Sequence, residues 1–250
     1  MSIDNFNMLK VIEDFPQQCK TALELTKGMS VSGEINKIVI AGMGGSAISG
    51  DLLKTYMGSS KIPVFIVRDY KVPSFVDEDT LVFAISYSGN TEETISAFED
   101  AVKKKAKIIA IASGGRLASM AKKVIKIPAG LQPRAALGYL FFPTLGVLTN
   151  SNIVDVKSDE ITEMLDTLSK TNDFKAFGES LAKKIQNRIP IIYASELLGA
   201  VAYRWKTQFN ENSKIPAFCH VFSEMNHNEI AGYQTINKNN FIVIFIRDKE

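Results

Sequence analysis

Cysteine is scarce in this sequence, and the two that occur, Cys19 and Cys219, are far apart and lack the spacing of metal ligands. A disulfide framework is therefore not expected, and a reducing compartment is the default. The N-terminus lacks a basic segment followed by an apolar core, so we predict no signal peptide. The longest apolar stretch, around residues 139–148, covers about ten residues, whereas a bilayer span needs roughly 20. We expect a cytoplasmic protein with no membrane partner.

An excess of charge of one sign is also lacking. The chain has 29 basic and 27 acidic residues, which give a formal net charge of +2. This near-balance gives no support for a nucleic-acid or membrane-surface partner. Histidine is rare as well, and neither His220 nor His227 belongs to a cluster spaced like metal ligands. We therefore predict neither a metal nor a cofactor.

Continuous apolar runs alternate with helical patterns along most of the chain. This alternation predicts an α/β fold with parallel sheets that helices cover on both faces. The expected strands are 37–41, 63–67, 81–85, 108–111, 124–127, 191–193, 218–221 and 241–245. The expected helices are 4–27, 46–57, 92–104, 134–149, 160–186 and 196–209.

Polar residues at 152–159 mark the expected domain boundary. We divide the chain into an N-terminal domain, 1–152, and a C-terminal domain, 153–250, as two α/β modules in tandem. The last strong strand is followed by only a few residues, and a parallel strand needs a covering element. We therefore expect either that the second module is truncated or that it is unusually small.

A glycine-rich segment, Gly42-Met43-Gly44-Gly45-Ser46, leaves the first expected strand and opens a helix. Glycines allow a tight turn and a close approach of the backbone to a ligand. Backbone N–H groups, a hydroxyl and the positive end of a helix then lie together, which favours an anion site. The segment matches neither a P-loop nor the dinucleotide-binding spacing. A plain turn with Ser46 as helix cap is the alternative.

A second segment, Ser86-Tyr87-Ser88-Gly89-Asn90-Thr91, also joins a strand to a helix. Ser86, Ser88 and Thr91 place three hydroxyls around one helix N-terminus, which is more than capping requires. Hydroxyls and amides suit the oxygens of a phosphate without a permanent cation. A polar turn without a ligand is the alternative.

These two segments resemble the phosphosugar-binding loops of SIS (sugar isomerase) domains. The resemblance continues through Pro133-Arg134-Ala135-Ala136-Leu137-Gly138-Tyr139, Phe209-Asn210-Glu211-Asn212-Ser213-Lys214 and Glu224-Met225-Asn226-His227-Asn228-Glu229. Together these motifs are similar to the bifunctional phosphoglucose/phosphomannose isomerases of archaea and some bacteria. The serine-rich loop alone identifies only the superfamily, whereas Glu211 together with His227 is more specific.

The resemblance implies two SIS-type (flavodoxin-like) modules, in a homodimer with composite active sites, and sugar 6-phosphates as substrates. It implies that Gly45, Ser46, Ser86, Ser88 and Thr91 hold the substrate phosphate. It also implies three roles at the reacting sugar: Arg134 near the reacting carbons, Glu211 as the proton-transfer base, and His227 in ring opening. Family members extend further, through a C-terminal helix that this sequence lacks.

These residue types suit an aldose–ketose isomerisation through a cis-enediol. One carboxylate, Glu211, can take a proton from one carbon and return it to the other. Glu211 follows an expected amphipathic helix whose residues Leu197 and Trp205 are expected in the protein core. We expect partial burial to raise the basicity of Glu211. Arg134 can stabilise the enediolate charge, and His227 titrates near neutrality, which suits ring opening. We interpret His220, inside a strand, as a hydrogen-bonded structural residue.

Three functions remain open from the sequence. The first is metal-independent interconversion of glucose 6-phosphate, and of mannose 6-phosphate, with fructose 6-phosphate. The second is a phosphosugar-binding sensor or regulatory protein without turnover, although no DNA-binding or nucleotide-binding domain is visible. The third is another SIS enzyme such as an aminating isomerase, and the absence of a glutaminase-like N-terminal domain argues against the fused form.

Overall fold

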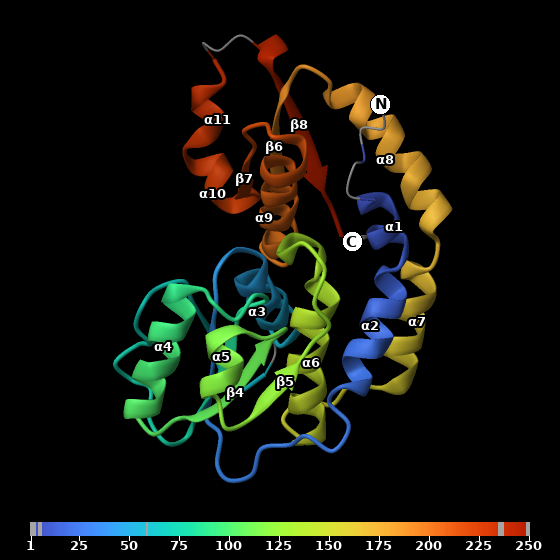
Figure 1. Cartoon of the computed structure of the whole chain (residues 1–250). Helices are drawn as coiled ribbons and strands as arrows, with labels where there is room; N and C mark the ends of the chain where they lie inside the picture. Colours follow the sequence, from blue (N-terminus) through green and yellow to red (C-terminus); the bar gives the residue numbers. More distant parts are fainter. Residues whose placement is uncertain (1–3, 5–6, 59, 235–237, 249–250) are drawn as a thin grey trace. The chain divides into compact units, whose positions relative to one another are not determined.

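Figure 1 shows a computed structural model of the chain, which describes residue 4 and residues 7–58, 60–234 and 238–248. The chain divides into two compact units, Met1–Ser169 and Lys170–Glu250, and each unit has its own parallel sheet. Among the described residues, no helix is long and apolar enough to cross a lipid bilayer.

The sheet of the first unit has five parallel strands in the order β2-β1-β3-β4-β5. Its strands are β1 (Lys37–Ala41), β2 (Val64–Val67), β3 (Thr80–Ile85), β4 (Lys107–Ala112) and β5 (Val124–Lys126). Every residue of β3 is buried, as expected of a central parallel strand covered on both faces. The strand order reverses between β1 and β3, and ligands of such sheets bind beyond the carboxyl ends of the strands at this point.

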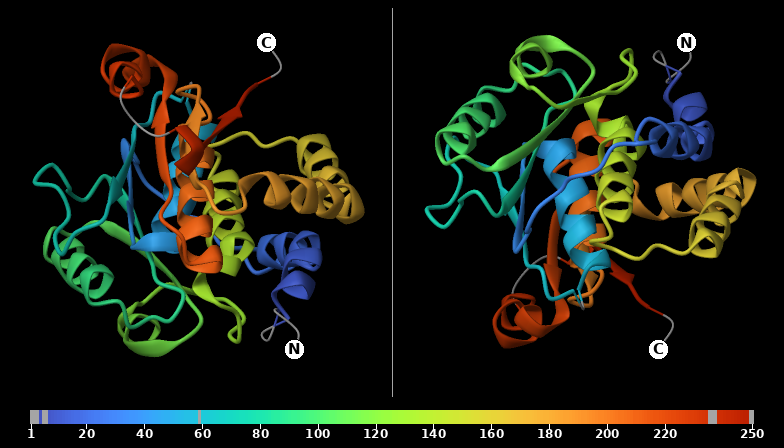
Figure 2. Two further views of the ribbon diagram at one scale, coloured as in Figure 1. Left: turned by 90° about the horizontal axis from the view of Figure 1, so that it is seen from above. Right: turned by 90° about the horizontal axis from the view of Figure 1, so that it is seen from below.

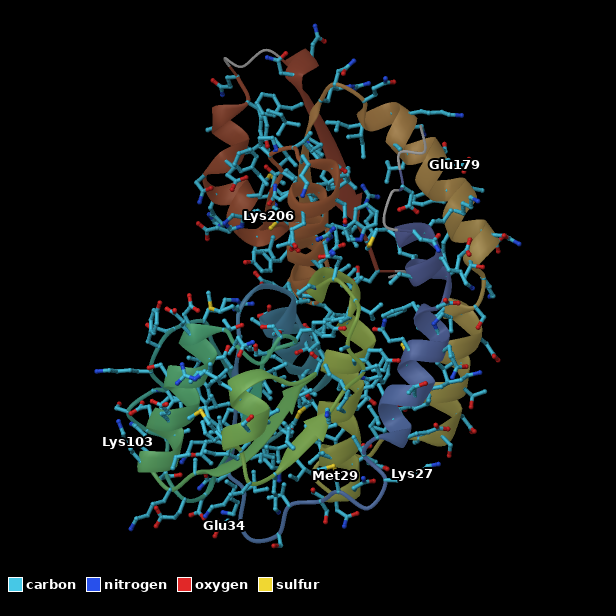
Figure 3. All side chains as sticks on the ribbon, in the orientation of Figure 1. Lys27, Met29, Glu34, Lys103, Glu179 and Lys206 are labelled. Atoms are coloured by element: carbon cyan, nitrogen blue, oxygen red, sulfur yellow. The ribbon has the colours of Figure 1, made fainter. Side chains whose placement is uncertain are left out.

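Helices cover both faces of this sheet (Figures 1 and 2). The helices are α1 (Met8–Glu13), α2 (Phe15–Glu24), α3 (Gly44–Tyr56), α4 (Glu92–Lys103), α5 (Gly115–Met120), the 3₁₀ turn η1 (Pro133–Ala135), α6 (Leu137–Asn150) and α7 (Ser158–Leu168). Strand β1 shows the layering: Ile38 and Ile40 pack into the core under α2, α3 and α6, whereas Val39 packs into the core under α4. On the far side of α4, Lys103 points away from the sheet (Figure 3).

The second unit has a smaller parallel sheet with the order β7-β6-β8. Its elements are α8 (Thr171–Ile185), β6 (Ile189–Ala194), α9 (Gly199–Gln208), the π-helical turn η2 (Phe209–Ser213), β7 (Phe218–Val221), α10 (Phe222–His227), α11 (Glu229–Gly232), the 3₁₀ turn η3 (Lys238–Asn240) and β8 (Phe241–Ile246). Its core is small and lies between β6 and α9, around Ile192, Ala194 and Ala202. Helix α8 buries only Ile185 among its residues, and Glu179 lies on its exposed surface (Figure 3).

The α/β class and the parallel strands agree with the sequence prediction, but three predicted helices are each divided in two. The expected helix 134–149 begins in the 3₁₀ turn η1 and continues as α6 after Ala136. The expected helix 4–27 ends at Glu13 and restarts at Phe15. Pro16 lies in the first turn of α2, where its missing N–H costs no intrahelical bond. The expected helix 160–186 is interrupted at Ser169, whose backbone N–H and hydroxyl both donate to the carbonyl of Leu165.

Helix α7 belongs to the first unit by its packing. Ile161, Met164, Leu165 and Leu168 pack against the core that lies under α2 and α6. The compact units therefore divide after Ser169. The domain boundary expected between residues 152 and 153 stays a prediction.

Candidate functional site

The loop after β1 lies against the end of β3. A Cβ at Gly42 would lie 2.8 Å from the carbonyl oxygen of Ile85, so only glycine allows this approach. Gly44 has a φ of 50°, in the left-handed region that glycine adopts without strain. The loop then opens α3, with Ser46 buried in its first turn. The two segments selected from the sequence thus start from neighbouring strands, and the first lies against the end of the strand from which the second starts.

The loop after β3 has its own network of hydroxyl groups. Ser86 is 1% exposed, and its hydroxyl accepts a hydrogen bond from the backbone N–H of Gly89 at 3.0 Å. The same hydroxyl lies 2.9 Å from the hydroxyl of Thr91. Thr91 occupies the N-cap position of α4, yet its side chain makes no capping bond to any described residue. Ser88 is exposed, and its hydroxyl accepts from the N–H of Asn90 at 3.2 Å.

A third loop, residues 113–116 after β4, holds the serine loop in place. The backbone N–H and the hydroxyl of Ser113 both donate to the carbonyl of Tyr87, at 2.9 and 2.7 Å. A Cβ at Gly89 would lie 1.8 Å from the carbonyl oxygen of Gly114, so this contact requires glycine. The sequence analysis missed this loop, although a Ser-Gly-Gly segment directly after a predicted strand could have indicated it.

The side chain of Tyr87 joins the serine loop to the segment that leads to Arg134. Its hydroxyl donates to the carbonyl of Pro128 at 3.0 Å and accepts from the N–H of Leu131 at 2.8 Å. Burial raises the pKa of Tyr87, so its hydroxyl stays protonated and remains a donor. The sequence does not predict this role of Tyr87, because the partners of its hydroxyl lie 41 and 44 residues away along the chain.

Arg134 lies in η1, next to the first turn of α3. A Cβ at Gly45 would lie 3.1 Å from the carbonyl oxygen of Pro133 and 3.6 Å from the Cα of Arg134. Gln18 of α2 holds the other side of this turn. Its amide nitrogen donates to the carbonyl of Ala135 at 3.1 Å, and its amide oxygen accepts from the N–H of Gly138 at 2.6 Å. The buried Gln18 thereby fixes the junction between η1 and α6.

The first unit therefore brings six of the predicted site residues to one end of its sheet: Gly45, Ser46, Ser86, Ser88, Thr91 and Arg134. They lie beyond the carboxyl ends of β1 and β3 or against the loop there, which is the expected place for a ligand. The N-termini of α3 and α4, the hydroxyls and one guanidinium favour an anion. The carboxylates of Glu92 and Glu93 in the first turn of α4 oppose part of this effect.

Glu211 lies in the second unit, in the π-helical turn η2. It is exposed, so the expected partial burial is wrong. The α-helical spacing of side chains does not continue to Glu211, because the helix changes to a wider π-helical turn after Gln208. Leu197, expected in the core, is 56% exposed. Burial lowers the pKa of Arg204 on α9, and the negative charge of Glu211 acts in the opposite direction.

Side-chain hydrogen bonds to backbone carbonyls stabilise η2. The side-chain amide of Asn210 donates to the carbonyl of Ile215 at 2.9 Å, and the ammonium of Lys214 donates to the carbonyl of Glu211 at 2.7 Å. Lys214 has a φ of 57°, a conformation rare outside glycine. A cavity of about 460 Å³ lies beside the turn, with Phe209, Ile215 and residues at the end of α8 in its walls. π-Helical turns are frequent at functional sites.

His227 is the last residue of α10 and is exposed. Glu211 precedes β7 along the chain and His227 follows it. His220 lies within β7, where its Nδ1 accepts from the N–H of Val221 at 2.9 Å and its Nε2 lies 4.0 Å from Glu229 Oε1. These contacts agree with the structural role predicted for His220.

Within the described part of the chain, no group of three or more His, Cys, Asp or Glu side chains could hold a metal ion. The metal-free chemistry expected from the sequence stays a prediction.

Two family models match this chain. Residues 34–145 match the SIS domain, and residues 174–250 match the bacterial phospho-glucose isomerase C-terminal SIS domain. The chain is similar to the bifunctional phosphoglucose/phosphomannose isomerase of Caldicellulosiruptor bescii, with 46% identity over 91% of this chain and 72% of that protein. It is also similar to the protein of the same name from Thermoplasma acidophilum, with 48% identity over 86% of this chain and 69% of that protein.

Solved structures show the same fold at low identity. The C-terminal domain of glucosamine-fructose-6-phosphate aminotransferase from Francisella tularensis has a TM-score of 0.73 and 18% identity, covering 100% of this chain and 78% of that one.

Proposed function

The chain belongs to the bifunctional phosphoglucose/phosphomannose isomerase family, and we propose that it interconverts glucose 6-phosphate and mannose 6-phosphate with fructose 6-phosphate, without a metal. The observation that carries this proposal is the hydroxyl network between Ser86 and Thr91, next to the glycine loop of α3. It provides neutral donors at two helix N-termini for a phosphate group.

Each proposed binding residue has a separate task. The backbone around Gly45 and the hydroxyl of Ser46 would bind the phosphate from the α3 side. Ser86, Ser88 and Thr91 would bind it from the α4 side. Neutral hydrogen-bond donors allow a metabolite to leave again, because they offset less of its charge than a buried cation does.

The proposed chemistry is proton transfer between C1 and C2 of the open-chain sugar. The carboxylate of Glu211 takes the proton from one carbon, which gives a cis-enediol, and returns it to the other carbon. The guanidinium of Arg134 stabilises the developing negative charge and stays protonated throughout. His227 acts earlier, when it moves a proton between the anomeric hydroxyl and the ring oxygen to open the ring.

A homodimer with composite active sites is part of the proposal. Glu211 comes before β7 along the chain and His227 after it, and both side chains are exposed. The proposed chemistry requires both side chains near one sugar. Two copies of the chain can supply one residue each to a shared site. We also propose that the second unit is an SIS-type module and that the protein is cytoplasmic, where its free thiols, Cys19 and Cys219, would persist.

The function is tested with purified protein, fructose 6-phosphate and EDTA, with glucose 6-phosphate and mannose 6-phosphate quantified separately. The proposal predicts both products at a rate that EDTA does not change. If glucose 6-phosphate is the only product, the proposed phosphoglucose isomerase activity stands and the proposed phosphomannose isomerase activity is wrong. Binding of fructose 6-phosphate without either product would favour the phosphosugar-sensing alternative.

A further inference from the structure

We propose that Tyr193 is a positioning residue, which anchors the α10–α11 segment to the sheet and thereby places His227. This inference rests on the proposed role of His227 in ring opening. In the sequence, Tyr193 is only one apolar position of a predicted strand, and its pattern does not predict this role.

Tyr193 lies on β6, the central strand of the second sheet, and is 1% exposed. Its hydroxyl donates to Glu229 Oε2 at 2.6 Å and lies 2.5 Å from the hydroxyl of Tyr233. Both partners come from α11 or the residue directly after it. A buried hydroxyl of the sheet is thus bonded to the far end of the α10–α11 segment.

The ring of Tyr193 contacts the near end of the same segment. Phe222, the first residue of α10, stacks on it with a centroid distance of 6.5 Å and an interplanar angle of 30°. Phe245 of β8 completes the cluster at 6.3 Å from Tyr193 and 5.6 Å from Phe222. Aromatic pairs at these distances are attractive beyond the area that they bury. One side chain therefore contacts the segment at both ends, and His227 lies between the two contacts.

None of the described residues of α10 or α11 is buried, so these short helices supply no core of their own. Other links also reach the rest of the unit: the hydroxyl of Ser223 donates to Glu196 Oε1 at 2.6 Å, and Glu229 Oε1 lies 4.0 Å from His220 Nε2. The bond to Tyr193 differs from these two contacts because its donor is buried, which reduces competition from water.

The geometry matters for the proposed chemistry. A proton-transfer group must lie within hydrogen-bond reach of its substrate, and a displacement of 1 Å can cost a factor of about 100 in rate. Burial raises the pKa of Tyr193, and the hydroxyl therefore remains a donor to Glu229 throughout the neutral range.

The test uses Tyr193→Phe, which keeps the ring contacts and removes the hydroxyl. With a sugar 6-phosphate as substrate, kcat should fall between about 10-fold and 100-fold, while KM changes little, because the proposed phosphate site lies in the first unit. Tyr70→Phe, at an exposed tyrosine of the first unit, is the matched control and should leave kcat unchanged. A kcat equal to that of the unchanged protein in Tyr193→Phe would overturn the inference.

A second variant separates positioning from general destabilisation. Glu229→Ala removes the same hydrogen bond from the other side, and the double variant should be no slower than the slower single variant. Glu229→Gln keeps an acceptor for the hydroxyl and should recover most of the kcat that Glu229→Ala loses. Additive losses in the double variant, or no recovery in Glu229→Gln, would contradict a shared anchor.

An NMR measurement tests the anchor independently of catalysis. The chain has two histidines, so the imidazole spectrum contains two sets of signals, which His227→Gln assigns. In Tyr193→Phe the His227 signals should shift or broaden, whereas in Tyr70→Phe they should not. If the unchanged protein has no isomerase activity but the His227 signals respond in this way, the proposed function fails and the anchor stands. Unchanged His227 signals in Tyr193→Phe would refute the anchor in either case.

Discussion

The hydroxyl of Thr91 lies 2.9 Å from the hydroxyl of Ser86, although Thr91 occupies the position from which a threonine normally caps its own helix. Its side chain thus faces the loop rather than the first turn of α4. An N-cap threonine contributes about 1 kcal/mol to stability when it bonds to its helix. Thr91 does not make that bond, and its hydroxyl lies instead within the serine loop of the proposed phosphate site.

The first prediction concerns Thr91→Val, which keeps the side-chain shape and removes the hydroxyl. The free energy of unfolding should fall by about 0.5–1.5 kcal/mol, because the hydrogen bond to the buried hydroxyl of Ser86 is lost although no capping bond is. KM for fructose 6-phosphate should rise between about 10-fold and 100-fold, which corresponds to one hydrogen bond to a charged phosphate. Urea unfolding and steady-state kinetics measure the two effects. Thr162→Val, on the exposed face of α7, is the control. A loss of stability without a change in KM would show that Thr91 is only structural.

The second prediction concerns the contact between Gly45 and the turn that carries Arg134. In Gly45→Ala the new methyl group would lie 3.1 Å from the carbonyl oxygen of Pro133, so η1 must move by a few tenths of an ångström. kcat/KM should therefore fall by roughly 3-fold to 10-fold.

The control for this substitution is Gly178→Ala on α8, where a Cβ would meet no described atom within 4 Å. It should raise the free energy of unfolding by about 0.5–1 kcal/mol and leave activity unchanged. Equal kinetics of Gly45→Ala and the unchanged protein would mean that the position of η1 does not matter for turnover.

The third prediction concerns pH. Burial raises the pKa of the Cys19 thiol to about 12. Below the unfolded pKa the thiol is protonated in both states and does not affect stability. Above it, only the unfolded state releases the proton, so stability falls by up to about 1.4 kcal/mol per pH unit until the folded pKa is reached.

This effect is measured by urea unfolding at pH 8 and pH 10.5. The decrease between these pH values should be smaller in Cys19→Ala than in the unchanged protein, even though the alanine variant is less stable at both. At pH 8 the native Cys19 should also fail to react with a thiol reagent, whereas the half-buried Cys219 should react slowly. An identical pH dependence in both proteins would exclude a raised pKa at Cys19.

The fourth prediction concerns the composite site. Glu211→Gln and His227→Gln should each be inactive, because each removes one proposed acid–base group. When the two variants are unfolded together and refolded as a mixture, activity should return, since a mixed dimer contains one site with both groups. Refolding each variant alone is the control. An inactive mixture that still forms dimers would place both residues in one copy of the chain.

The strands were predictable because β-branched and apolar residues form continuous runs, which is typical of buried parallel strands. Helix α5 and the loop before it were missed, because a six-residue helix after two glycines has little apolar periodicity. The role of Gln18 was also invisible: its partner Gly138 lies 120 residues away, and no local pattern predicts such a contact. The exposure of Glu211 was mispredicted because the π-helical turn breaks the helical spacing. Local patterns thus indicated the elements, while long-range hydrogen bonds and backbone irregularities decided the details of the site.

The turnover of fructose 6-phosphate by Glu211→Gln in the presence of EDTA tests the proposed mechanism most directly. We expect kcat to fall between about 100-fold and 10,000-fold, because this is the usual contribution of general base catalysis. The dissociation constant for fructose 6-phosphate should stay within about threefold of that of the unchanged protein, since the proposed phosphate site is intact. Glu163→Gln, at an exposed position of α7, should behave like the unchanged protein. Full turnover by Glu211→Gln would contradict the proposed mechanism.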